Sequence, residues 1–101
     1  MLVKILTTNG EIYMAMSKEQ KTIFKNYMII GKKQYIKAQE FEAKSQFEQA
    51  KNSYYIAMQN FCYAFILAKD NNDFCQEEAN REYRLSKAMH ENMMKIISRQ
   101  K

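Results

Sequence analysis

Cysteine and histidine are the side chains of this sequence best suited to ligate a transition metal or to act as nucleophiles, and the chain holds few of them. Cys62 and Cys75 do not have a CxxC spacing, and His90 is the single histidine. A structural zinc site needs four such ligands, so the sequence predicts no metal site. Because His90 has no cysteine or carboxylate at the spacing of a catalytic pair, we expect it to be a half-buried helix residue.

Hydroxyl nucleophiles and phosphate-binding loops also lack a sequence context. Ser17, Ser45 and Ser53 lie in no recognisable nucleophile motif. The two glycines, Gly10 and Gly31, are too far apart to form a loop that cradles phosphate. The sequence therefore predicts a protein that is not an enzyme and that takes no cofactor.

Positive charge is concentrated in one segment. The net charge is +5, and its excess lies in residues 18–37, where six lysines (Lys18, Lys21, Lys25, Lys32, Lys33 and Lys37) face only Glu19. On a helical projection Lys18, Lys21, Lys25 and Lys32 fall within about 60° of one another, and we call them the basic face. This face could bind a phosphate backbone, an acidic protein surface or an anionic membrane, or simply be solvated. The segment has no arginine and no RNA-binding signature.

The first sixteen residues form an N-terminal extension with a pattern of their own. Apolar residues alternate on both sides of Asn9-Gly10, and this dipeptide favours a tight β-hairpin turn because both residues tolerate positive φ. An isolated hairpin is only marginally stable in water. Two interpretations stay open: an ordered hairpin over residues 1–16, or a dispensable segment if Met14 or Met16 is the physiological start.

Residues 17–101 are predicted to form a single helical domain. Ser17 with Gln20 has the pattern of a capping box at the start of a first helix that should close near Ser45. Gly31 weakens this helix at its middle and marks either a bend or the end of a short preliminary helix.

Two further helices are expected, over about 47–69 and from about residue 74 to about Arg99. Asp73 is the expected N-cap of the last helix, with Gln76 three positions on. Short loops between long helices require antiparallel neighbours, so the sequence predicts an all-α, antiparallel three-helix bundle.

Small and aromatic residues alternate in the middle helix. Ala50 and Ala57 stand seven residues apart, and Phe47, Tyr54 and Phe61 follow the same step. Alanine removes bulk where two helices approach closely, and aromatic side chains fill the space to either side. The pattern indicates a packed helical hairpin, and core packing alone accounts for most of these residues.

The two cysteines are expected to remain reduced. If the chain turns near residue 71, Cys75 lies level with about Leu67, so Cys62 is on the order of 8 Å further along its helix. A disulfide needs a Cα separation below about 7 Å. Free thiols indicate a reducing compartment, and no apolar run approaches the roughly 20 residues of a membrane span. We therefore expect a cytoplasmic protein.

The helical hairpin resembles two known families. Small and aromatic residues are spaced as in a tetratricopeptide repeat, although no second copy of the motif follows. The stretch KAQEFEAKSQFEQAKNSYYIAMQNFCYAF is more similar to the microtubule-interacting-and-transport (MIT) domain, with its Lys-Ala step, acidic cluster, aromatic before Glu-x-Ala and Tyr-x-x-Ala. Leu85-Ser86-Lys87-Ala88 is similar to the family's third helix. The resemblance covers about residues 32–97.

The MIT resemblance implies binding without chemistry. MIT domains accept short helical or extended tails of ESCRT-type filament proteins in grooves between their helices. Leu85 matches the position that receives ligand leucines between helices two and three, and Met89 lies one turn beyond it. Met58, Cys62 and Phe65 would form the opposite wall. The family commonly has an acidic residue near Met89, and this sequence lacks it.

Three hypotheses about function follow. The first is a protein-interaction module that binds a partner's peptide or helix in an inter-helix groove, because methionine-rich surfaces suit adaptable binding. The second is an electrostatic binder of nucleic acid or anionic membrane through the basic face. The third is a small chaperone or accessory protein of a phage or secretion system that associates with itself as a homodimer.

Overall fold

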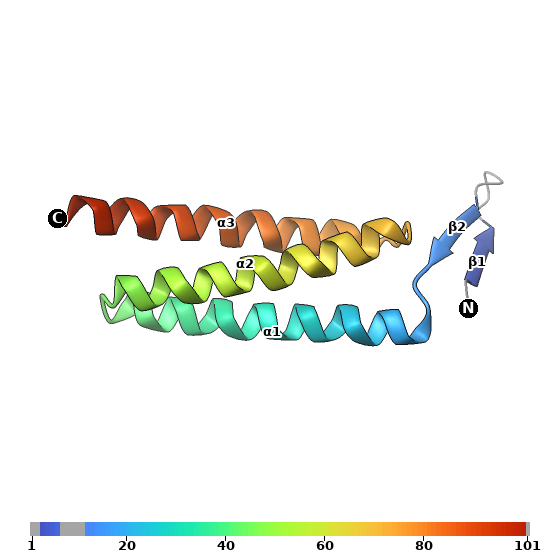
Figure 1. The fold of residues 1–101 in the computed structure, drawn as a ribbon, viewed down its shortest axis with the longest axis horizontal. Coiled ribbons are helices and arrows are strands. Elements are labelled where there is room, and N and C mark those ends of the chain that lie inside the picture. The colour runs from blue at the N-terminus through green and yellow to red at the C-terminus, as the bar shows by residue number, and fades with distance from the viewer. Residues whose placement is uncertain (1–2, 7–11, 101) are drawn as a thin grey trace.

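Three long helices form the body of the protein. The computed structural model describes residues 3–6 and 12–100. Strands β1 (Val3–Leu6) and β2 (Ile12–Ala15) precede α1 (Lys18–Ala43), α2 (Phe47–Asp70) and α3 (Cys75–Arg99). In Figure 1 α2 lies between α1 and α3 and runs antiparallel to both. The antiparallel three-helix bundle predicted from the sequence is confirmed.

The middle helix holds the bundle together. α2 packs along both α1 and α3, whereas α1 and α3 approach each other much less closely. The Cα atoms span 57 × 23 × 16 Å, so the bundle is long and flattened. One side of α2 therefore faces the core between the outer helices, and its other side faces solvent.

The α1 boundaries follow from local chemistry. The backbone N–H of Gln20 donates to Ser17 Oγ (3.2 Å), and the Ser17 N–H donates to Gln20 Oε1 (2.8 Å), which is the predicted capping box. The helix ends at Ala43, two residues before the expected end. Ser45 has φ 59°, a left-handed conformation that a helix cannot continue through.

The expected bend or break at Gly31 does not occur. α1 continues through Gly31, which is buried against the ring of Phe61 in α2. A Cβ atom built on Gly31 would lie 2.6 Å from Cε1 of Phe61, closer than van der Waals contact allows. The glycine therefore serves the packing of α1 on α2, and the sequence alone did not reveal its aromatic partner.

The alanine pattern of α2 sets the core. Its inner stripe recurs at four- and three-residue steps, and all its members are fully buried: Ala50, Tyr54, Ala57, Phe61, Ala64 and Ala68. The buried side chains form two clusters, one around Phe61 and one around Tyr54. The Tyr54 hydroxyl donates to Glu42 Oε1 (2.8 Å), so the phenol has a partner inside the core.

The N-terminal strands lie beyond the end of the bundle that holds the α2–α3 loop (Figure 1). They pair antiparallel, with Val3 opposite Ala15 and Leu6 opposite Ile12. The predicted turn at Asn9-Gly10 lies outside the described residues. Met16, which follows β2, is 2% exposed and packs in the Phe61 cluster, so the chain is anchored at this point.

Asp73 joins this N-terminal segment to the start of α3. Its Oδ1 accepts from the Cys75 N–H (2.9 Å) and its Oδ2 from the Met16 N–H (3.4 Å). Burial raises the pKa of the Asp73 carboxyl, but these hydrogen bonds and the charge of Lys21 outweigh burial, so the pKa is lowered from 3.8. Asp73 thus caps the first turn as predicted, although the helix begins at Cys75 and Phe74 occupies the N-cap position.

We predict that Gly31→Ala destabilises the protein despite the better helix propensity of alanine. The propensity gain is about 1 kcal/mol, whereas overpacking a buried contact costs about 1–3 kcal/mol. Chemical denaturation should show a lower free energy of unfolding for Gly31→Ala. The same substitution in a Phe61→Leu background should cost less or become stabilising, and an increase in stability with Phe61 intact would contradict the packing argument.

We predict that Asp73→Ala lowers the free energy of unfolding at pH 7 by about 1 kcal/mol, because a helix cap is lost. The folded pKa lies below the unfolded one, so the stabilisation by ionised Asp73 is present above about pH 4 and disappears as the pH falls through the folded pKa. Urea unfolding between pH 2.5 and 7 should therefore show the two proteins converging at low pH. A constant difference over this range would rule out the ionised cap.

Candidate interaction surfaces

Met58 and Cys62 lie on the side of the bundle where α2 meets the outer flank of α3. Together with Gln59, Tyr63 and Tyr83 they line a shallow pocket of about 170 Å³. Only Tyr83 in this set belongs to α3. This pocket therefore contains Met58 and Cys62 of the predicted α2 wall, but it is lined by neither Phe65 nor Leu85.

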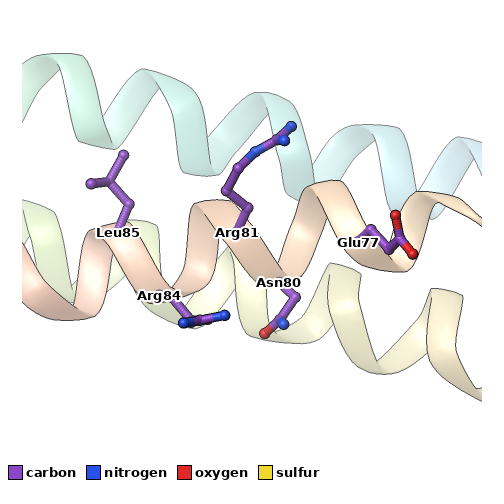
Figure 2. Close-up of a pocket in the computed structure, with 5 residues that line it drawn as sticks. All are labelled: Glu77, Asn80, Arg81, Arg84 and Leu85. Atoms are coloured by element: carbon purple, nitrogen blue, oxygen red, sulfur yellow. The ribbon is translucent and has the colours of Figure 1, made fainter.

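Leu85 lies on the other side of α3. Figure 2 shows its side chain pointing toward α1, as does that of Arg81, while Arg84 and Asn80 point away from α1. These residues and Glu77 all belong to α3 and line an open hollow of about 770 Å³ along that helix, where 46% of Leu85 is exposed. Leu85 is thus a large apolar side chain on an open and charged surface.

The structure does not bring the five predicted groove residues together. Met89 packs on the Tyr54 cluster and borders a hollow that includes Glu42 of α1. Phe65 packs on the Phe61 cluster, with Lys69 Nζ 5.8 Å from its ring centre. The prediction of one groove formed by Leu85, Met89, Met58, Cys62 and Phe65 is therefore replaced by separate surfaces on opposite sides of α3.

Helical geometry explains this separation. The buried line of α3 is Ala79, Ser86 and Met93. Each helical residue turns by about 100°, so Leu85 lies to one side of Ser86, the side that meets α1. The MIT resemblance implied that Leu85 lies between α2 and α3. In the structure the side of α3 that carries Leu85 faces α1.

An exposed ion pair links α1 to α3. Lys32 Nζ lies 3.4 Å from Glu78 Oε1. Burial, followed by the charges of Glu82 in α3 and Glu42 in α1, raises the pKa of the Tyr35 hydroxyl. Leu85 in α3 lies seven residues, or about two turns, beyond Glu78 of this pair.

Two arginines border Leu85 and were missed in the sequence analysis. Arg81 and Arg84 are exposed, and they stand one turn and one residue before Leu85. In the part of the chain that the structure describes, ion pairs join Lys32 to Glu78 and Lys51 to Glu48, and neither includes an arginine. The signal available in the sequence was their spacing of four residues and one residue from Leu85.

The basic face lies on α1 beside the same surface. Its four lysines, Lys18, Lys21, Lys25 and Lys32, are all exposed. Lys25 and Lys32 border a hollow with Phe24, Met28, Ile29 and Glu78 of α3. The basic face therefore forms the α1 edge of the α1–α3 side, and Arg81 and Leu85 form its α3 edge. We call this combined region the α1–α3 surface.

The residues that could do metal or redox chemistry stand apart. Cys62 and Cys75 are both free thiols, as expected, and both are half-buried. Burial, with a hydrogen bond to Asp73, raises the pKa of the Cys75 thiol. His90 is half-buried, with Nδ1 3.2 Å from the Lys51 carbonyl oxygen and its ring 5.3 Å from that of Tyr55. Over residues 3–6 and 12–100, no three cysteine, histidine or acidic side chains form a group that could hold a metal ion.

Comparisons leave function to be inferred from this geometry. No known protein family, curated protein or solved structure matches the chain. Within the described residues, no helix combines the length and hydrophobicity needed to cross a bilayer. On the α1–α3 surface, Leu85 of the predicted groove lies on the same side of the bundle as the basic face.

Proposed function

We propose that this protein is a non-enzymatic interaction module that binds a short helical or extended segment of a partner protein along the α1–α3 surface. The observation that supports it most is the exposure of Leu85 in a hollow that arginines border. An exposed leucine among charged side chains offers a contact for one apolar side chain of a ligand. MIT-like binding of a filament protein's tail is the specific form suggested by the sequence resemblance.

The charges around Leu85 specify the kind of segment. Arg81 and Arg84 border it on α3, and Lys25 and Lys32 line the α1 edge nearer the start of the bundle. A ligand with an apolar residue and nearby carboxylates would place its charges against these side chains. We therefore propose an acidic segment.

Acidic side chains on the same surface favour a protein segment over nucleic acid. Glu78 pairs with Lys32, and Glu77 lies in the Leu85 hollow. A duplex carries a uniform array of phosphates, which these carboxylates would repel. A peptide can place its carboxylates selectively and present apolar groups between them. Binding of nucleic acid or anionic membrane by the basic face is the second candidate.

A peptide selection tests the proposal directly. We expect a random peptide library, selected on the purified protein, to enrich segments with a leucine or similar apolar residue flanked by Asp or Glu. Leu85→Asp should weaken binding of the best peptide by about 30-fold or more, as expected for a buried anchor contact. Arg81→Glu should weaken it by about 10-fold, because one charged contact becomes repulsive. Fluorescence anisotropy would measure both affinities.

Met94→Asp is the matched control, since Met94 lies on α3 with 51% exposure but outside the Leu85 hollow. It should leave the affinity unchanged. Circular dichroism would verify that each variant is folded. Equal losses for Leu85→Asp and Met94→Asp would contradict the site, and so would salt-sensitive binding to duplex DNA or anionic vesicles that Leu85→Asp leaves intact.

A further inference from the structure

The solvent-facing side of α2 has an unusual composition for a surface helix. Residues 52–68 of α2 contain no charged side chain. Several large apolar residues on this helix are nevertheless exposed: Tyr55, Ile56, Tyr63 and Ile66. A surface helix ordinarily carries charged residues on its outer side, so an uncharged and partly aromatic outer side indicates a protein contact.

Most exposed residues of α2, together with the half-buried Gln59, follow a second regular stripe. Asn52, Ile56, Gln59, Tyr63, Ile66 and Asp70 recur at alternating four- and three-residue steps, as the buried inner stripe does. This is the spacing by which one helix packs along another. We call it the outer stripe. α2 thus carries one seam that forms the core of the bundle and another that no part of the described chain covers.

α1 extends this surface. The rings of Tyr27 in α1 and Tyr63 in α2 lie 5.5 Å apart, and Ile23 and Ile30 are exposed on the same face of α1 as Tyr27. Six side chains contribute, Ile23, Ile30, Tyr55, Ile56, Tyr63 and Ile66, each at least 40% exposed. If each buries on the order of 100 Å², the surface could bury roughly 600 Å² per copy, against about 800 Å² in a standard interface.

We propose that the outer stripe joins two copies of this chain into a homodimer with antiparallel α2 helices. The stripe is self-complementary when it is reversed about its midpoint between Gln59 and Tyr63. Ile56 then packs on Ile66 of the second copy, Gln59 faces Tyr63, and Asn52 faces Asp70. A two-fold interface requires this kind of match between a surface and itself.

Charge placement favours a second copy as the occupant. Each chain carries a net charge of +5, so two copies repel unless the contact keeps their charges apart. The basic face lies on the flank of α1 opposite Ile23, Tyr27 and Ile30, next to Glu78 of α3. In the antiparallel dimer the two basic faces therefore point away from each other, and the uncharged residues 52–68 meet at the centre.

Sedimentation equilibrium over a concentration range tests the dimer. Ile56→Lys should raise the dimer dissociation constant by about 100-fold or more, because each copy then buries a lysine against Ile66. The double variant Ile56→Lys/Ile66→Glu should recover most of the association, since each lysine then meets a glutamate of the other copy. In a parallel arrangement like charges would meet, so the double variant would remain dissociated.

Ile29→Lys is the matched control, because Ile29 has the same 40% exposure as Ile56 but borders the α1–α3 surface. It should leave the dimer intact, and circular dichroism should show all variants folded. A wild-type protein that stays monomeric at about 100 µM would overturn the proposal. This holds also if the monomer binds lipid vesicles through the outer stripe. A dimer unaffected by Ile56→Lys, or a double variant that fails to recover, would overturn it as well.

Discussion

The close approach of α1 to α2 at Gly31 is the contact on which the rest of the structure depends. The ring of Phe61 occupies the space that a side chain at position 31 would take. Buried alanines at positions 50, 57, 64 and 68 extend this close packing along α2. Because these small residues stand between the large rings of Tyr54 and Phe61, both outer helices can lie against α2, and α1 and α3 need only a few direct contacts.

Helical periodicity then determines which residues remain outside. Once the inner stripe of α2 faces the core, the outer stripe must face solvent, because the two are separated by about half a turn. The same argument applies to α3, where burial of Ser86 and Met93 leaves Leu85 on the flank that meets α1. The two exposed surfaces are thus consequences of how the core is packed.

The sequence predicted the helices well and the surfaces less well. Helix positions, the Ser17 cap, the role of Asp73, the buried alanines and the free thiols all depend on local pattern and chain reversal, which sequence spacing specifies. The predicted groove of Leu85 with Met58 was wrong because it depended on which side of α3 faces α2. Adjacent residues on a helix lie about 100° apart, so an error of one residue in that assignment moves a side chain to another side of the helix. The partner of Gly31 was missed because it comes from another helix.

The two proposed surfaces lie on opposite sides of the molecule, so a protein could use both at the same time. The outer stripe faces away from the core, whereas the α1–α3 surface lies where the outer helices approach each other. A dimer joined through the outer stripe therefore leaves both copies of the α1–α3 surface open. Two sites on one rigid particle suit a partner that presents repeated segments, such as a filament, since the second contact forms at high effective concentration. Such an arrangement allows weak individual contacts at Leu85 to give strong overall binding.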